Sequence, residues 1–405
     1  MGHTELEMST LAESALQPGQ DPRAHARLLS RVRDSALAGT APPAAPRAVI
    51  GASWRRVLSR GLDPGGQTDV PLLEVAELER RRASSDLAPL LPLLRDRLLP
   101  AAEAAGQLLV VVDASGRVLW REGGAGVRRR ADALGFVLGS AWDEDSVGTN
   151  AIGTSLVVGS PVHVYAGEHY AETHQPWTCA AAPLHDPLTG RLLGAVDLSG
   201  PASTVHPSTV ALVDAVARLA ELELRLAAEQ RSAALREVAA PLLARLSGPA
   251  LVVGADGVTA AARQLDAPRR VALPDGLQAG PAWLPAVGPC TAEPLPGGWL
   301  LHVAGPGGTP TTLTLGGPAG RVVVTTASGT WSHHLTPRHT EILLALARRP
   351  AGYSAAELST HLFGDPGRTV TVRAEMSRLR RTIGALLEHR PYRLADHVQV
   401  ADQRV

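Results

Sequence analysis

One stretch near the C-terminus restricts the fold more than any other. Between Arg368 and Gly384, apolar residues recur at spacings of four, three and four, namely Val372, Met376, Leu379 and Ile383. This is the period of an amphipathic helix. The other positions include arginines at 373, 378, 380 and 381. A helix with one buried face and one guanidinium-rich face suits a groove lined by phosphates, but an ordinary solvated basic surface has the same pattern.

The flanking segments favour the first interpretation. Thr336 and Pro337 are suited to begin one helix, expected over 337–348, and Ser354 with Glu357 forms a capping-box pattern for a second, over 355–362. Strands are expected before these helices at 311–315, 322–326 and 330–335. Two more are expected after them, at 391–394 and 398–400, as a hairpin. This order predicts a winged helix-turn-helix over residues 306–405.

The segment TVRAEMSRLRR (371–381), followed downstream by YRL (392–394), resembles the OmpR-type effector domain of bacterial response regulators. That family places such a helix in the major groove of double-stranded DNA. The resemblance implies DNA contacts by Arg368, Thr371, Arg373, Ser377, Arg378, Arg380, Arg381 and Arg393. Glu375 departs from the family pattern; it either accepts a hydrogen bond from cytosine or turns away. From His333 onward the chain has eleven arginines against seven acidic residues, although its total charge is zero.

Composition removes several classes of protein. The 405 residues contain no lysine, which excludes a phosphate-loop lysine, a kinase lysine and a Schiff-base lysine in this sequence. The two cysteines, Cys179 and Cys290, are too far apart for a CxxC motif. No apolar run reaches the roughly 20 residues that span a bilayer, and residues 1–20 do not resemble a signal peptide. We therefore expect a cytoplasmic protein that is not an enzyme and needs no cofactor.

A second informative region is expected to be an α+β sensor-like domain over residues 104–206. Apolar runs predict strands at 107–113, 118–120, 153–158, 161–165, 178–184 and 191–198. Between them lie the blocks VGTNAIGT (147–154), Glu168-His169, WTCAAAP (177–183), His185-Asp186 and DLSG (197–200). These blocks resemble the GAF domain of acetoin-catabolism-type transcriptional activators. Those activators continue into a lysine-dependent ATPase, whereas the whole arrangement here resembles the GAF-domain, helix-turn-helix regulators common in actinobacteria.

The GAF resemblance suggests residues that line a pocket for a small molecule: Asn150, His163, His169, Trp177 and Cys179. Other interpretations stay open. Asn150 and Thr154 can simply hold a turn, and the domain can serve only as a dimerising scaffold. The histidines at 163, 169, 174 and 185 with Cys179 could form a metal or haem pocket, although their spacing fits no compact zinc pattern. A hydrolase that uses Cys179 and His185 is a further alternative.

The rest of the chain completes an α+β multidomain architecture. Residues 1–20 are expected to be a disordered tail and 21–103 a helical N-terminal region, in which basic pairs such as Arg55-Arg56 face solvent. A coupling helix is expected within 207–246; it ends at Pro241 and forms a parallel dimer seam. Residues 247–305 are expected to form a small PAS-like β segment.

Together these features predict a homodimeric one-component transcriptional regulator that binds double-stranded DNA and contacts RNA polymerase. The alternative is a GAF-based signalling scaffold whose winged domain binds protein instead of DNA.

Overall fold

The computed structural model describes residues 13–65, 70–274, 276–303, 311–315, 321–326 and 329–402. The chain divides into two compact units, residues 1–227 and 228–405. The first unit begins with four helices: α1 (Pro22–Leu37), α2 (Ala48–Ser59), α3 (Val75–Ala83) and α4 (Leu91–Ala105). Helices were predicted near these positions. No helix among the described residues is long and apolar enough to cross a membrane.

The predicted disordered tail needs a correction. Residues 1–12 lie outside the described residues, but Ala15 and Leu16 are each only 4% exposed. The backbone N–H of Ala15 donates to the His163 ring at 3.1 Å, and Ala15 packs in a small core with Leu29 and Tyr165. The chain is therefore ordered well before residue 20, because an apolar pair there finds a partner surface.

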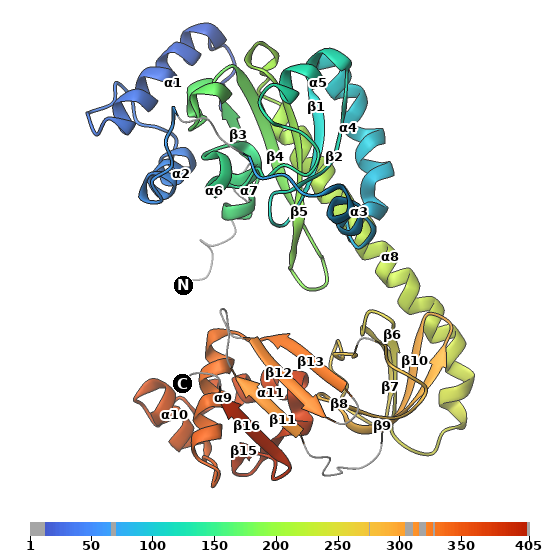
Figure 1. Ribbon diagram of the computed structural model, residues 1–405. Coiled ribbons are helices and arrows are strands. Elements are labelled where there is room, and N and C mark those ends of the chain that lie inside the picture. Colours follow the sequence, from blue (N-terminus) through green and yellow to red (C-terminus); the bar gives the residue numbers. More distant parts are fainter. Residues whose placement is uncertain are drawn as a thin grey trace. The chain divides into compact units, whose positions relative to one another are not determined.

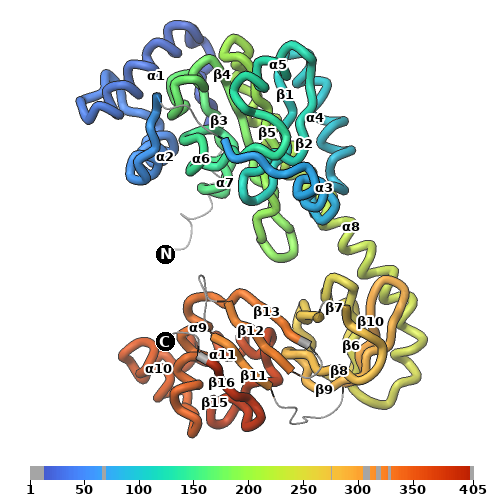
Figure 2. Tube along the Cα trace, viewed as in Figure 1, coloured from blue at the N-terminus to red at the C-terminus, as the bar shows by residue number. Residues whose placement is uncertain are grey.

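The first unit is built on a five-stranded antiparallel sheet in the order β2-β1-β5-β4-β3. Its strands are β1 (Leu108–Asp113), β2 (Val118–Gly123), β3 (Val162–Tyr165), β4 (Trp177–His185) and β5 (Leu192–Pro201). One face packs against α4 and against helix α8 (Thr209–Arg245). The other face packs against α5 (Ala125–Asp132), α6 (Glu144–Val147), α7 (Ala151–Val158) and the N-terminal helices α1 and α2, which lie near the β3 edge (Figures 1 and 2).

The strand predicted at 153–158 is wrong, because this segment is helix α7. Asn150 caps the helix by accepting from the Gly153 N–H, and Gly159 ends it in the left-handed conformation. Residues 151–155 are all buried, so no alternation of polar and apolar residues was available to distinguish a short helix from a strand.

Helix α8 also differs from expectation, because it continues through Pro241 to Arg245. A proline inside a helix removes one backbone hydrogen bond and costs about 3 kcal/mol. Apolar packing beyond it offsets that cost: Leu242, Leu243 and Leu246 pack against a core with Val252 and Leu300 of the second unit's sheet.

The second unit contains another five-stranded antiparallel sheet, in the order β7-β6-β10-β9-β8. Counted from its own first strand, this order is the same as that of the first sheet. The strands are β6 (Ala250–Gly254), β7 (Thr259–Arg263), β8 (Gly280–Leu284), β9 (Gly288–Leu295) and β10 (Gly298–Val303). Here the connection between the second and third strands contains no helix among its described residues.

The C-terminal part of this unit holds a four-stranded sheet in the order β13-β12-β11-β16, and three helices. The elements are β11 (Thr311–Leu315), β12 (Arg321–Thr326), β13 (Gly329–His334), α9 (Pro337–Arg348), α10 (Ala355–Phe363), α11 (Thr369–Ile383) and β16 (Val398–Asp402). Thr336 caps α9, and Ser354 and Glu357 form the capping box of α10, as predicted.

The expected terminal hairpin is not formed. Strand β15 (Tyr392–Leu394) pairs instead with β14 (Leu387–His389), while β16 runs parallel to β11. The connection 395–397 has three residues, a length that is common in hairpins. Its sequence therefore did not reveal that the two strands pair with separate neighbours.

Candidate nucleic-acid interface and sensor core

Helix α11 has the two faces that its sequence predicts. Val372, Met376, Leu379 and Ile383 are at most 1% exposed and belong to one core with apolar residues of α9 and α10. Arg373, Ser377 and Arg380 are exposed on the other side. The buried stripe fixes the rotation of the helix, so these polar side chains are held on the outer surface of the unit.

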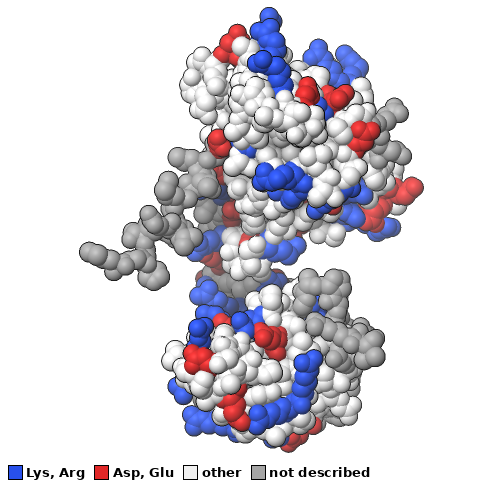
Figure 3. All heavy atoms as spheres, turned by 90° about the vertical axis from the view of Figure 1, so that its left-hand side faces the viewer, with Lys and Arg blue, Asp and Glu red and all other residues white. Residues whose placement is uncertain are grey.

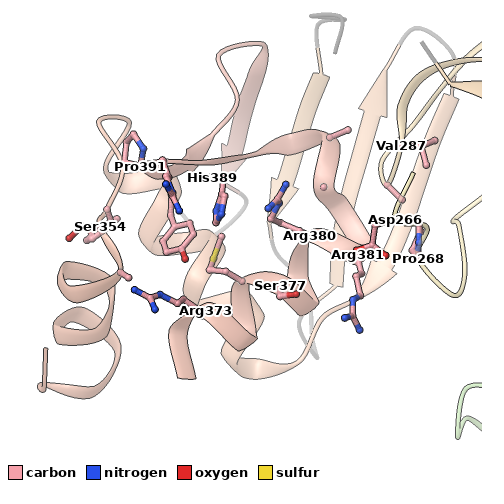
Figure 4. A pocket seen from close by; sticks show the side chains of 18 residues that line it. Asp266, Pro268, Val287, Ser354, Arg373, Ser377, Arg380, Arg381, His389 and Pro391 are labelled. Carbon is pink, nitrogen blue, oxygen red and sulfur yellow. The ribbon is translucent and has the colours of Figure 1, made fainter. Parts of the chain in front are cut away.

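Part of the outer face lines a hollow of about 1030 Å³ (Figure 4). Four predicted DNA-binding residues meet there and follow one side of α11: Arg373, Ser377, Arg380 and Arg381. The hollow is also lined by Ser354, by His389 at the end of β14 and by Arg390, which follows it. Among the described residues, Arg373, Arg380 and Arg381 make no ion pair with an acidic side chain. The hollow therefore combines four arginine side chains, three from α11 and one just after β14, with the Ser354 hydroxyl and the His389 ring.

The other four predicted DNA-binding residues do not line the hollow. Thr371 is exposed near the start of α11. Arg368 lies 3.6 Å from the Asp365 carboxylate. Arg393 pairs with both Glu388 and Asp396, each at 2.8 Å. These acidic neighbours reduce the positive potential that the two arginines offer to a phosphate.

Arg378 and Glu375 form a pair of their own. An Nη of Arg378 donates to Glu375 at 2.6 Å, and the other Glu375 oxygen lies 3.1 Å from Nε2 of His339 on α9. That second contact lacks hydrogen-bond geometry, so it is attractive only when the imidazole is protonated. The Glu375 side chain is 17% exposed and lies between Arg378 and His339.

Sequence reasoning missed the contribution of the second sheet to this hollow. Asp266, Pro268, Ala286 and Val287 line its far wall, and the Ala385 N–H donates to the Pro285 carbonyl at 3.0 Å. Nothing local in residues 266–287 signals this contact. His389 and Arg390 could have been noticed, because they are basic residues directly before the YRL strand. On the face shown in Figure 3, basic and acidic groups are interspersed.

In the first unit, Asn150 has a structural role. Its amide nitrogen donates to the carbonyls of Trp142 and Gly148, and its oxygen accepts from the Gly153 N–H. All three bonds hold the turn that leads into α7. This agrees with the interpretation of Asn150 as a residue that holds a turn.

His163 is likewise occupied. Nδ1 accepts from the Ala15 N–H, so the ring proton is on Nε2, 3.1 Å from the Thr178 hydroxyl. Burial and the nearby Arg47 lower the pKa of His163 to about 3. The ring is therefore neutral, and both of its nitrogens are used within the fold.

His169 and His174 present a different situation. Their ring centroids are 6.3 Å apart, and His174 stacks on Trp142 at 4.9 Å. Burial lowers the pKa of His169 to about 3 and that of His174 to about 4. Nδ1 of His169 donates to the Ala166 carbonyl at 3.1 Å. Nε2 of His169 and Nδ1 of His174 are buried and have no hydrogen-bond partner among the described residues.

Asp197 on β5 is the third buried polar group of this kind. One of its oxygens accepts from Ser199, and the other has no partner among the described residues. Burial raises the pKa of Asp197 to about 8, so the carboxyl group is protonated at neutral pH. Asp197 lies opposite Ala181 on β4, and Ala181 and Trp142 belong to the same apolar core.

Cys179 and Trp177 are buried on β4, at 8% and 6% exposure. Burial raises the pKa of the Cys179 thiol well above its ordinary value, which disfavours the nucleophilic thiolate. His185 is six residues further along the same strand, roughly 20 Å away, and lies 3.2 Å from Glu221. The structure therefore separates the Cys-His pair considered from sequence. Among the described residues, no three His, Cys, Asp or Glu side chains converge as metal ligands.

Two buried carboxylates, Glu168 of the Glu168-His169 block and Glu144, anchor the N-terminal helices instead of facing a pocket. Glu168 is 1% exposed and accepts two hydrogen bonds from Arg47, at 2.7 and 2.8 Å. Glu144 is 2% exposed and accepts two from Arg56, at 2.9 and 2.7 Å. Burial alone would raise the pKa of Glu144, but hydrogen bonds from Arg56, Ser53 and Thr154 hold it below its usual value. Arg56 was expected to face solvent, which is wrong.

The first unit is similar to a known family. Residues 31–221, which include α2 to α7, the end of α1 and the first sheet, match the family model described as MimR, N-terminal domain. The activator AcoR of the acetoin dehydrogenase operon from Bacillus subtilis is 35% identical over 43% of this chain and 29% of its own length. The activator MimR of the propane 2-monooxygenase operon from Mycolicibacterium goodii is 29% identical over 56% of this chain and 38% of its own length. The chain thus spans well under half of either activator.

Among solved structures, the Escherichia coli DhaR(N)–DhaL complex matches 63% of this chain and 99% of that chain, with 21% identity and a TM-score of 0.44. Over most of its length the chain resembles a protein from Rhodococcus erythropolis, described as an uncharacterized 47.3 kDa protein in the thcA 5' region. The two are 31% identical over 388 residues, which cover 94% of this chain and 72% of that protein. The chain therefore belongs to the same family as the 47.3 kDa Rhodococcus protein.

Proposed function

We propose that this chain is a one-component transcriptional regulator, in which a GAF-type sensor domain controls a C-terminal winged helix-turn-helix that binds double-stranded DNA. The relatives of its N-terminal unit are named as transcriptional activators, which supports a regulatory role. Such a protein would act in the cytoplasm, on the chromosome.

The exposed face of α11 carries the DNA-binding part of the proposal. Four buried apolar residues hold the helix so that Arg373, Ser377 and Arg380 point outward. An arginine projecting from a helix in the major groove can donate two hydrogen bonds to a guanine edge, which is worth about 1–3 kcal/mol of discrimination. His389 at the end of β14 and Arg390 in the β14–β15 turn suit the phosphates beside that groove.

Our proposal for the mode of regulation rests on the lack of lysine in this sequence. These 405 residues have no lysine and hence no phosphate loop of the kind that hydrolyses ATP. We therefore propose that the regulator acts by occupying its operator and contacting RNA polymerase. Two copies on a two-fold operator would each place one α11 in the major groove.

For the sensor domain we propose a small, neutral, polar ligand. His169, His174 and Asp197 are all uncharged at neutral pH and each has a buried polar atom without a partner among the described residues. An unpaired buried polar atom costs about 1–3 kcal/mol, which a ligand with both donor and acceptor groups would recover. A thermal-shift screen in which only charged compounds raise the melting temperature would contradict this ligand class.

The DNA-binding proposal is tested with duplexes selected from a random library and fluorescence anisotropy over a range of salt concentrations. The affinity of the wild-type protein should fall steeply with salt, because counterions are released on binding. Arg380→Ala and Arg373→Ala should weaken binding about 5- to 150-fold if they contact bases, or lower the salt slope by about one if they contact phosphates. Arg128→Ala is the matched control, since it removes an exposed arginine of α5.

Two results would reject the proposal: selection that enriches no duplex, and a loss of affinity in Arg380→Ala and Arg373→Ala no greater than that in Arg128→Ala. Circular dichroism and melting temperature establish that each variant is folded. This is expected, because both substitutions fall on the exposed side of α11.

A further inference from the structure

The connection between β7 and β8 borders the hollow beside α11. Asp266 and Pro268 of this connection line the hollow. In Figure 4 they lie toward the end of α11 that carries Arg381, away from Arg373 and Ser354. The residues that directly follow Pro268 are therefore placed to continue this surface beyond the C-terminal end of the helix.

Backbone hydrogen bonds hold the next part of the connection on the second sheet. The Thr259 N–H donates to the Arg269 carbonyl at 2.9 Å, and the Val271 N–H donates to the Gly257 carbonyl at 2.8 Å. Val271 is 1% exposed and belongs to the core that also contains apolar residues of α9, α10 and α11. Because close-packed cores transmit position, this shared core holds the connection in a fixed place relative to α11.

Two arginines on this connection, Arg269 and Arg270, direct positive charge to solvent. Both are exposed. Arg270 forms an antiparallel bridge with Val258, and side chains alternate along such extended backbone, so Arg270 projects away from the core that Val271 enters. Among the described residues, neither arginine forms an ion pair with an acidic side chain. Their guanidinium groups are therefore free to bind an anion.

The two arginines enlarge a surface that is already cationic. Four arginines line the neighbouring hollow, against one acidic residue, Asp266. A duplex that receives α11 in its major groove continues past the end of the helix, and it carries one phosphate charge about every 1.7 Å along its axis. Residues beside the end of the helix meet that backbone and not the base edges, which the helix itself occupies.

We propose that Arg269 and Arg270 bind phosphates of the DNA that flanks the site contacted by α11, so that the second sheet is part of the DNA interface. This inference rests on the proposed function, because it requires α11 in the major groove. Contacts to phosphates position a protein on the duplex without sequence preference. The connection thus adds affinity at the end of α11, while base recognition stays with the helix.

The first test measures how salt weakens binding of the full chain to a duplex selected from a random library. In Arg269→Ala/Arg270→Ala, the slope of log affinity against log salt should become shallower by about 1.8. Affinity should therefore fall roughly 30-fold at about 0.15 M salt and hardly at all at about 1 M salt. Arg269→Lys/Arg270→Lys should keep the wild-type slope, because lysine also binds phosphate as a point charge.

The matched control is Arg231→Ala/Arg245→Ala, which removes two exposed arginines of α8. The end of this helix packs on the second sheet through a separate core that contains Val252 and Leu300. The control should therefore keep the wild-type slope. All variants should keep the wild-type circular dichroism spectrum and melting temperature, since the backbone hydrogen bonds of the β7–β8 connection do not use the substituted side chains.

The second test shortens the duplex to the bases that α11 contacts, which removes the flanking phosphates. Trimming should cost the wild-type protein roughly 30-fold more affinity than it costs Arg269→Ala/Arg270→Ala, because the variant has already lost those contacts. Equal losses on trimming, or a salt slope of the variant equal to that of the control, would overturn this inference and leave DNA binding by α11 standing. A wild-type protein that selects no duplex would overturn the proposed function and this inference together.

Discussion

The substitution Arg47→Met isolates the anchoring of the N-terminal helices. It removes the guanidinium group that donates to both oxygens of Glu168, at 2.7 and 2.8 Å, but keeps most of the side-chain volume. Glu168 is 1% exposed, and one donor would remain, the Tyr165 N–H at 3.0 Å. Removing one partner of a buried ion pair costs about 3–5 kcal/mol. We therefore expect the free energy of opening helix α2 to fall by about 3 kcal/mol.

Hydrogen exchange measured by mass spectrometry suits this prediction, because the chain has two units and its unfolding need not be a single transition. A loss of 3 kcal/mol corresponds to a fall in protection of roughly 150-fold for amides of residues 48–59. Arg60→Met is the matched control at the end of the same helix. Its pair with Asp145 is exposed on both sides, 48% and 65%, and should contribute less than about 1 kcal/mol. Equal effects of the two substitutions on the protection of α2 would refute the reasoning.

Two further predictions concern pH and charge. His163, His169 and His174 are buried and neutral, with folded pKa values of about 3–4 against 6.5 in the unfolded chain. The stabilisation from each neutral imidazole is therefore complete above pH 6.5. It is lost as the pH falls below 6.5, by up to about 1.4 kcal/mol per pH unit for each histidine. Asp197, with its pKa raised from 3.8 to about 8, has the opposite sign. Its contribution to stability is fully present below pH 3.8 and is lost as the pH rises from there to about 8, so Asp197→Asn should abolish this loss in urea unfolding. Glu375→Gln should release Arg378 and strengthen DNA binding a few-fold at moderate salt; weaker binding would instead indicate that Glu375 contacts a base.

Local patterns were sufficient for much of the fold. The spacing of Val372, Met376, Leu379 and Ile383 predicted both the extent of α11 and its buried face. The capping residues of α9 and α10 marked where those helices begin. Each of these signals lies within one element, where neighbours in sequence are also neighbours in space.

Other errors arose where partners are far apart in sequence. Arg56 resembles a solvated basic residue until Glu144, 88 positions later, is folded against it. Trp283 of β8 and Trp331 of β13 pack at 5.8 Å, although neither residue's local sequence predicts the contact. The same limit applies to the sensor core, where the sequence marks His163 and His169 equally as pocket candidates. Only the structure shows that both ring nitrogens of His163 are hydrogen-bonded, whereas Nε2 of His169 has no partner among the described residues.

The second sheet is better understood as part of the unit that contains α11 than as a spacer before it. A spacer would expose one polar face across the whole sheet, whereas the apolar residues of the central strands β6 and β10 are covered on both faces. On one face Val252 and Leu300 pack under Leu235 and Ala239 of α8. On the other face Leu251, Val253 and Leu301 are buried in a core shared with α9, α10 and α11. The boundary expected at residue 305 therefore crosses a single core, and a signal that alters the packing of α8 on this sheet acts on the body that holds α11.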